Sequence, residues 1–259
     1  MDTYESAGPR GRRAPDLLSC SRVTAALDVR RLRAVILDVD GTLYHQGPVR
    51  RGMFWRLVRA HIGAPRVGIH TMRALRAYRH AQETLRTAAA DTPDLASAQL
   101  RLACRACGVA EERVAACVAR WIDTEPLGLV ARSRRDGVAE FLRTARGRGL
   151  RLGVFSDYPP GPKLEALGVA GLVDVMVCAQ DVEVCRFKPH PRGLEVTARQ
   201  LGVDPKHAMY VGDRPETDAA AAAAAGMTCA IVGGRRPRMG EAWLSVSGYQ
   251  ALSDAILAV

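Results

Sequence analysis

Two carboxylates that lie two positions apart are the first feature of this sequence able to do chemistry. Asp38 and Asp40 follow an apolar run, and side chains two apart in extended backbone project to the same side. Carboxylates this close repel each other, and a hard cation that prefers oxygen ligands, such as Mg²⁺, relieves the repulsion. Gly41 then permits a sharp turn and Thr42 supplies a hydroxyl. On its own, this pattern is more typical of a solvated turn than of an active site.

Three further polar elements follow later apolar runs. Ser156 ends the run LRLGVFS, and Lys188 precedes a proline. Gly212 and Asp213 follow AMYV, with Asp218 about one helical turn further on. Each element has an ordinary interpretation, as a helix N-cap, a surface cation or an acid at a helix N-terminus. Lys188 nevertheless stands out, because the chain has 34 arginines and only three lysines, and a compact ammonium group binds phosphate as a point charge.

The elements that position these residues alternate between strands and helices. Such alternation implies crossover connections, and it predicts an α/β fold with a mainly parallel sheet covered on both faces. Ligands bind at the carboxyl ends of parallel strands, so we expect the polar elements to meet at that edge. The predicted strands cover 34–37, 150–156, 173–179, 208–212 and 228–234, and the predicted helices 137–149, 163–167, 192–202 and 215–225.

A block with only helical periodicity separates the first strand from the others. Two helices are predicted over 54–62 and 71–86, and another over 111–122. Between them, Thr92 is the predicted N-cap of a helix that begins at Pro93 and is stopped by Gly108. We therefore divide the chain into a flexible leader (1–32), a core (33–44 and 132–259) and an inserted helical domain (45–131).

Charge and composition limit the class of protein. The 259 residues are 48% hydrophobic with a net charge of +10, and no apolar run is long enough to span a membrane. Seven cysteines, an odd number, and an N-terminus unlike a secretory signal favour reduced thiols in the cytoplasm. We interpret Cys104 and Cys107 as helix packing residues, because no second pair completes a zinc site.

Taken together and in this order, the four elements resemble the motifs of the haloacid dehalogenase-like (HAD) superfamily of aspartate-nucleophile hydrolases. The resemblance runs from about Arg33 to Gly234. It implies a Rossmann-like core with an inserted all-helical cap of the C1 type, to which the block at 45–131 corresponds. The matching segments are AVILDVDGT at 34–42, VFSD at 154–157, Lys188-Pro189 and GDRPETD at 212–218.

The resemblance also implies a role for each matched residue. Asp38 would be the nucleophile that forms an aspartyl-phosphate, and Asp40 would protonate the leaving oxygen and then deprotonate water. The cofactor would be Mg²⁺, held by the Asp38 and Asp213 side chains and the Asp40 carbonyl and supported by Asp218. The residues expected around the phosphoryl group are Thr42, Ser156, Asp157 and Lys188.

These motifs favour a phosphatase acting on a small phosphorylated metabolite. Dehalogenases of the superfamily usually lack the second aspartate, and phosphonate-cleaving members use a cap lysine that this chain lacks. A phosphosugar mutase shares all four motifs and stays open. Candidates for contacting the rest of the substrate are Tyr44, His45, Arg76 and Arg79, although Arg76 and Arg79 also fit a solvated helix face.

The helical block supports one alternative of another class. Between positions 45 and 135 there are sixteen arginines, no lysine and seven acidic residues, a net charge of +9. A basic nucleic-acid-binding or scaffolding protein could use such a face. Binding of nucleic acid is disfavoured because the aromatic residues of the block have spacings that fit a helix core. It would also leave the complete set of catalytic residues unexplained. These aromatic residues are Phe54, Trp55, Tyr78 and Trp121.

Overall fold

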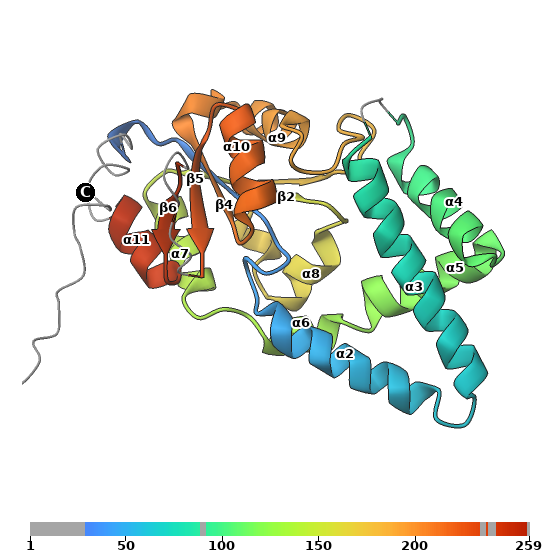
Figure 1. Ribbon diagram of the computed structural model, residues 1–259. Coiled ribbons are helices and arrows are strands. Elements are labelled where there is room, and N and C mark those ends of the chain that lie inside the picture. Colours follow the sequence, from blue (N-terminus) through green and yellow to red (C-terminus); the bar gives the residue numbers. More distant parts are fainter. Residues whose placement is uncertain (1–28, 89–91, 234–236, 238–241, 258–259) are drawn as a thin grey trace, which may run out of the picture.

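A computed structural model describes residues 29–257 of the chain apart from 89–91, 234–236 and 238–241. Its centre is a six-stranded sheet in the order β3-β2-β1-β4-β5-β6, in which every neighbouring pair is parallel (Figure 1). The predicted α/β fold class is therefore confirmed. The strands are β1 (Ala34–Leu37), β2 (Arg151–Ser156), β3 (Val175–Cys178), β4 (Ala208–Gly212), β5 (Thr228–Val232) and β6 (Leu244–Val246).

Helices cover both faces of the sheet because successive strand side chains point to opposite sides. Val35 and Leu37 pack into one buried cluster together with residues of α7 and α11, whereas Ala34 and Ile36 pack into a second cluster with α9 and α10 (Figure 1). The core helices are α7 (Val138–Gly147), α8 (Gly161–Ala166), α9 (Arg192–Leu201), the π-helical turn η5 (Pro215–Ala219) continuing into α10 (Ala220–Ala224), and α11 (Tyr249–Leu257).

The register of the central strands brings the predicted motifs to one edge. Leu37 at the end of β1 lies beside Val154 of β2 and Val211 of β4. The chain continues past Leu37 with the Asp38 amide donating to the Val211 carbonyl at 2.9 Å. The segments that follow β1, β2 and β4 therefore leave the sheet side by side, as the parallel arrangement predicted.

A helical cap follows β1, and the chain returns from it to the core at an isolated antiparallel bridge between Tyr44 and Arg134. The cap has its own small core, which includes Tyr78, Ala103 and Cys107. The packing role predicted for Cys107 agrees with this position. The boundaries 45 and 131 stay a prediction. The cap helices are α2 (Gln46–Ala60), α3 (Pro65–Arg86), α4 (Leu95–Cys107), α5 (Glu111–Val118), the π-helical turn η2 (Ala119–Thr124) and α6 (Leu127–Arg132).

The structure corrects two details predicted for the cap. The α4 helix begins at Leu95 rather than at Pro93, because Asp94 is the N-cap and its carboxylate accepts the Ser97 amide at 3.0 Å. Phe54 and Trp55, expected in a helix core, are 53% and 62% exposed. Within α2, only Val49 is buried, so one face of this helix packs and the aromatic side chains lie elsewhere.

Sequence patterns also missed one strand and two α-helices, which are β6, α6 and α11. A strand of three residues and a helix of six are too short to show a period. The flexible leader predicted for 1–32 lies outside the described residues as far as residue 28. Its last part, Val29–Arg31, is a short 3₁₀ helix.

The contact between α9 and β2 supplies a test of the packing. A Cβ added to Gly193 would lie 2.0 Å from the Phe155 ring, whereas a Cβ at Gly147 meets nothing within 4 Å. We expect Gly193→Ala to lower the free energy of unfolding by about 1–3 kcal/mol through overpacking. Gly147→Ala, the helical control, should raise it by up to about 1 kcal/mol. Urea unfolding measures both, and equal effects would contradict the packing described.

Candidate active site

A buried lysine joins the ends of β1 and β4. Lys188 is 1% exposed, and its Nζ lies 2.6 Å from Asp38 Oδ1 and 2.8 Å from Asp218 Oδ1. Nζ also donates to the Tyr210 hydroxyl at 3.0 Å. A buried ammonium group needs such partners, because burial without them costs several kcal/mol. Three of the predicted site residues are thus brought together, with Tyr210 as a fourth member that sequence analysis did not identify.

A second residue of the first motif, Thr42, fixes the carboxylate that contacts this lysine. Thr42 is fully buried and donates its hydroxyl to Asp38 Oδ2 at 3.0 Å. Both oxygens of Asp38 therefore have a partner, one from Lys188 and one from its own turn. Ser156, also buried, ends β2 on the neighbouring strand, and its Oγ accepts the Tyr158 amide at 3.4 Å.

A third carboxylate, that of Asp213, lies against the turn of the first motif. Gly41 has φ +97°, and a Cβ there would lie 2.1 Å from Asp213 Oδ2, so only glycine fits this position. Asp213 Oδ1 is buried and has no hydrogen-bond partner in the described part of the chain. Carboxylate oxygens of Asp38, Asp213 and Asp218 all lie within 4.8 Å of one another. An unpartnered oxygen in a group of this size fits a hard cation such as Mg²⁺.

Asp218 holds the loop that carries Asp213. Its Oδ2 accepts the backbone amides of Asp213 at 3.1 Å and Arg214 at 2.9 Å, while its Oδ1 binds Lys188. The two amides belong to the loop between β4 and η5. Asp218 thus orients Lys188 and the loop of Asp213, and the metal-supporting role expected of it stays a prediction.

Asp40 points away from the buried lysine and toward another one. Lys163 on α8 donates to Asp40 Oδ1 at 2.6 Å and to Oδ2 at 2.7 Å. The Tyr44 hydroxyl also donates to Asp40 Oδ1. The structure thereby brings Tyr44 to the site, and its predicted contact with the substrate stays a prediction. Sequence analysis did not identify Lys163. The rarity of lysine in this chain, which drew attention to Lys188, was a signal for Lys163 as well.

The first motif was expected to hold Asp38 in the ionised form and Asp40 in the protonated form, and the pKa shifts run the other way. Burial, with the neighbouring carboxylates adding to it and Lys188 opposing it, raises the pKa of Asp38 to about 7. Burial also disfavours the charged form of Asp40, but the charge and hydrogen bonds of Lys163 outweigh it and hold the pKa of Asp40 below its ordinary value. Asp40 was expected to be the protonated member, and its contact with Lys163 favours the ionised form.

The third carboxylate shifts in the same direction as Asp38. Burial, followed by the charge of Asp218, raises the pKa of Asp213 to about 6. Asp218 behaves oppositely, because Lys188 outweighs burial and lowers its pKa. A cluster with this much unbalanced negative charge is stabilised by a bound cation.

Asp157 fastens the cap to the core. Its Oδ2 accepts Gln82 Nε2 at 3.0 Å and Arg86 Nη2 at 2.9 Å, both from α3. Arg86 also donates to the Lys188 carbonyl. Asp157 was predicted to border the phosphate. That role stays a prediction, and the observed contacts favour docking of the cap instead.

A second set of polar contacts also joins the cap to the core. The Tyr158 hydroxyl donates to Gln82 Oε1 at 2.9 Å and accepts from Gln99 Nε2 at 2.9 Å. Gln180 of the core donates to Gln99 Oε1 at 3.0 Å, and the rings of Tyr158 and Tyr78 stack at 6.1 Å between centroids. The cap therefore meets the core both where the chain crosses between them and at this buried polar contact.

The remaining specificity candidates lie elsewhere. His45 is exposed at the start of α2, and its backbone amide donates to the Ser133 carbonyl at 2.8 Å. Arg76 and Arg79 are exposed on α3. The structure does not bring these three side chains to the carboxylate cluster, so their role in substrate binding stays a prediction.

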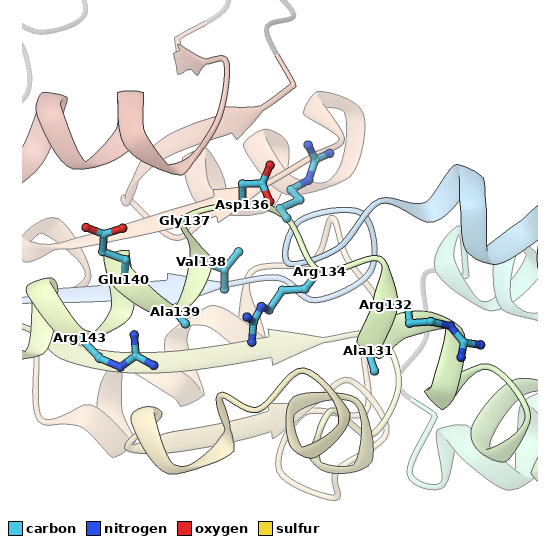
Figure 2. Close-up of a pocket in the computed structure, with 10 residues that line it drawn as sticks. Ala131, Arg132, Arg134, Asp136, Gly137, Val138, Ala139, Glu140 and Arg143 are labelled. Carbon is cyan, nitrogen blue, oxygen red and sulfur yellow. The ribbon is translucent and has the colours of Figure 1, made fainter.

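One surface pocket lies outside this site. Its volume is about 390 Å³, and it lies where the chain passes from α6 to α7 (Figure 2). Arg134 on its wall donates to the Leu167 carbonyl at 2.7 Å, and Arg135 donates to the Gly41 carbonyl at 3.0 Å. These hydrogen bonds thus hold the segment between α6 and α7 against the end of α8 and against the turn of the first motif.

This fold and site define a parallel α/β protein with a buried carboxylate and lysine cluster and a helical cap inserted after the first strand. The family model for haloacid dehalogenase-like hydrolases matches residues 32–226, so the chain belongs to that family. The predicted family and enzyme class, a hydrolase of phosphoric monoesters, are confirmed by this match together with relatives that carry phosphatase names.

Two curated relatives match most of the chain. A phosphoglycolate phosphatase of Rhodospirillum rubrum is 30% identical over 213 residues, covering 77% of this chain and 79% of that protein. A glyceraldehyde 3-phosphate phosphatase of Methanopyrus kandleri is 31% identical over 202 residues, covering 76% and 82%. The crystal structure of a 2-haloacid dehalogenase from Pseudomonas syringae has the same fold, with a TM-score of 0.61, 19% identity and coverage of 88% and 99%. Among the described helices, none has the length and apolar composition to cross a bilayer.

The contact between cap and core can be tested at Asp157. Its ion pair with Arg86 is mostly buried, so we expect Asp157→Ala to lower the free energy of unfolding by about 3 kcal/mol and to speed amide exchange at the end of α3. Glu183→Ala is the control. It breaks an exposed ion pair with Arg199 and should cost less than about 1 kcal/mol. Equal costs, with unchanged exchange in α3, would show that Asp157 does not fasten the cap.

Proposed function

We propose that this hydrolase is a Mg²⁺-dependent phosphatase that cleaves a small phosphorylated metabolite through an aspartyl-phosphate at Asp38. The observation that carries the proposal is the buried contact of Asp38 with Lys188, beside a carboxylate cluster that can hold a cation. When bound, such a cation would neutralise negative charge on the nucleophile and the phosphoryl group. Asp38, Asp213 and the Asp40 carbonyl are the proposed ligands.

The chain's own residues account for each step of the reaction. Because Lys163 favours the ionised form of Asp40, Asp40 has to take up a proton from solvent as the substrate binds. An oxygen of Asp38 then attacks phosphorus, and the bond from phosphorus to the leaving oxygen breaks as Asp40 gives that oxygen a proton. Asp40 then takes a proton from water, and the water oxygen attacks the aspartyl-phosphate. Inorganic phosphate leaves and the Asp38 carboxylate is regenerated. Lys188 and Ser156 hold the phosphoryl oxygens during both displacements.

A small substrate is favoured by the way the cap is fastened. Contacts from α3 to Asp157 and Lys188 hold the cap against the segments that follow β2 and carry the buried lysine. The two curated relatives are named for phosphoglycolate and glyceraldehyde 3-phosphate, both small phosphate esters. We further infer, from cysteine usage, that the enzyme acts in the cytoplasm.

The proposed nucleophile can be tested by substitution. We expect Asp38→Asn to lower kcat by at least about a thousandfold, because an amide oxygen cannot replace the attacking carboxylate. Release of inorganic phosphate from p-nitrophenyl phosphate measures the loss, and circular dichroism checks the fold.

The exposed carboxylate variant Asp254→Asn is the matched control and should keep the wild-type rate. A variant Asp38→Asn with more than a tenth of wild-type turnover would overturn the aspartyl-phosphate. A mutase would convert a phosphosugar into its isomer with little release of phosphate, and product analysis separates this alternative from a phosphatase.

The metal requirement is a separate test. Removal of divalent cations by EDTA should abolish turnover, and added Mg²⁺ should restore it. Ca²⁺ should inhibit, because it accepts more oxygen ligands at longer distances and can engage both oxygens of the attacking carboxylate. Full activity after exhaustive chelation would contradict the assignment of Mg²⁺.

A further inference from the structure

Lys163 is a cation at the site that the proposed reaction does not use. It comes from α8, its side chain is 12% exposed, and its Nζ contacts both oxygens of Asp40. Lys188 already serves as the cation for the phosphoryl oxygens, and its ammonium group is shared between Asp38 and Asp218. A second lysine beside Asp40 therefore needs a different explanation.

The position of Lys163 corresponds to the leaving-group side of the site. Asp40 is the residue proposed to contact the leaving oxygen, so a group bonded to Asp40 lies next to that oxygen. Lys163 lies on α8, which packs against α6 of the cap, so the lysine lies near the boundary between core and cap. The non-phosphate part of a substrate would occupy this boundary.

The contacts of Asp40 leave little room for a leaving group. Oδ1 accepts from Lys163 and Tyr44, and Oδ2 accepts from Lys163. A leaving oxygen has to displace one of these donors before it can reach Asp40. A substrate anion beside the leaving oxygen would attract Lys163 and release Asp40 in the same movement.

We propose that Lys163 is a specificity-determining residue that exchanges its ion pair with Asp40 for one with a carboxylate on the leaving group. The inference rests on the proposed phosphatase function and adds to it a substrate class, phosphate esters of short hydroxy acids. Two successive hydrogen bonds, from Lys163 to Asp40 and from Asp40 to the leaving oxygen, span about 6 Å at most. A carboxylate one carbon from the ester oxygen lies within that span, so Lys163 can reach it.

The test compares two esters with the same number of carbons. 2-Phosphoglycolate carries a carboxylate on the leaving group and ethyl phosphate does not. The wild-type kcat/KM should favour 2-phosphoglycolate, and Lys163→Met should reduce this preference by about 10- to 100-fold, the value of a hydrogen bond to a charged group. Lys163→Arg should restore part of the preference, because the charge is kept.

Lys206→Met is the matched control, since Lys206 is exposed and pairs with Asp204 away from the site. It should leave the preference unchanged. If Lys163→Met does not fold, Lys163→Gln replaces it, and thermal unfolding of each variant checks this. A loss of stability alone would lower activity toward both esters equally and leave the ratio of their kcat/KM values unmoved.

Two results would overturn the proposal, and they are distinguishable from failure of the proposed function. One is a wild-type enzyme that hydrolyses both esters equally well, and the other is a Lys163→Met variant whose preference stays within about threefold of wild type. In both cases phosphate release from ethyl phosphate shows that the phosphatase itself is intact. A wild-type enzyme that releases phosphate from no ester would overturn the function and the role of Lys163 together.

Discussion

The burial of the Lys188 ammonium group is the constraint on which the rest of the site depends. A charge that is 1% exposed is tolerated only where carboxylates and a hydroxyl replace the lost water. Asp38, Asp218 and Tyr210 supply these contacts. Asp38 directly follows β1, Tyr210 lies in β4 and Asp218 lies in η5. Removing one partner would leave the lysine with uncompensated charge, so the same contacts that stabilise the fold also place the nucleophile.

The arrangement around Lys188 also depends on Asp218 and on two glycines. Asp218 binds the lysine with one oxygen and two backbone amides with the other, which fixes the loop after β4. Gly212 is required there, because a Cβ would lie 2.4 Å from the Asp218 side chain. Gly41 likewise lets Asp213 approach the turn of the first motif. Local backbone freedom thus allows three carboxylates to converge on a small volume in spite of their mutual repulsion.

Sequence patterns identified the parts of the molecule that local chemistry determines. Five of the six strands follow from apolar runs ended by turn residues, and their parallel pairing follows from the helices between them. The convergence of Asp38, Lys188 and Asp218 was predicted for the same reason, since they lie at the carboxyl edge of one sheet. The convergence of Lys163 with Asp40 was not predicted. These residues are 123 positions apart, and no period or spacing relates them.

The predictions that were wrong for the cap have a different origin. The N-cap of α4 was placed at Thr92 because threonine followed by proline is a favourable helix start, but a carboxylate two residues later offers a stronger acceptor for the free amides. Phe54 and Trp55 were expected in a core because large aromatic side chains are usually buried. Burial depends on which face of a helix finds a partner, and α2 contributes only Val49 to the buried set. Tertiary packing, which a single sequence does not display, decided both outcomes.

The use of lysine connects these observations to function. In a chain whose cations are almost all arginine, an ammonium group is chosen where a planar guanidinium does not fit. The single nitrogen of Lys188 contacts Asp38, Asp218 and Tyr210 in different directions. The three N–H donors of an ammonium group can rotate to allow this, whereas the fixed planar donors of an arginine guanidinium cannot. Lys163 likewise bridges both oxygens of Asp40 from one point. Lys206, which is exposed and paired with Asp204, shows that rarity alone is not enough. A lysine is informative where burial and several acceptors around one nitrogen restrict the shape of the cation.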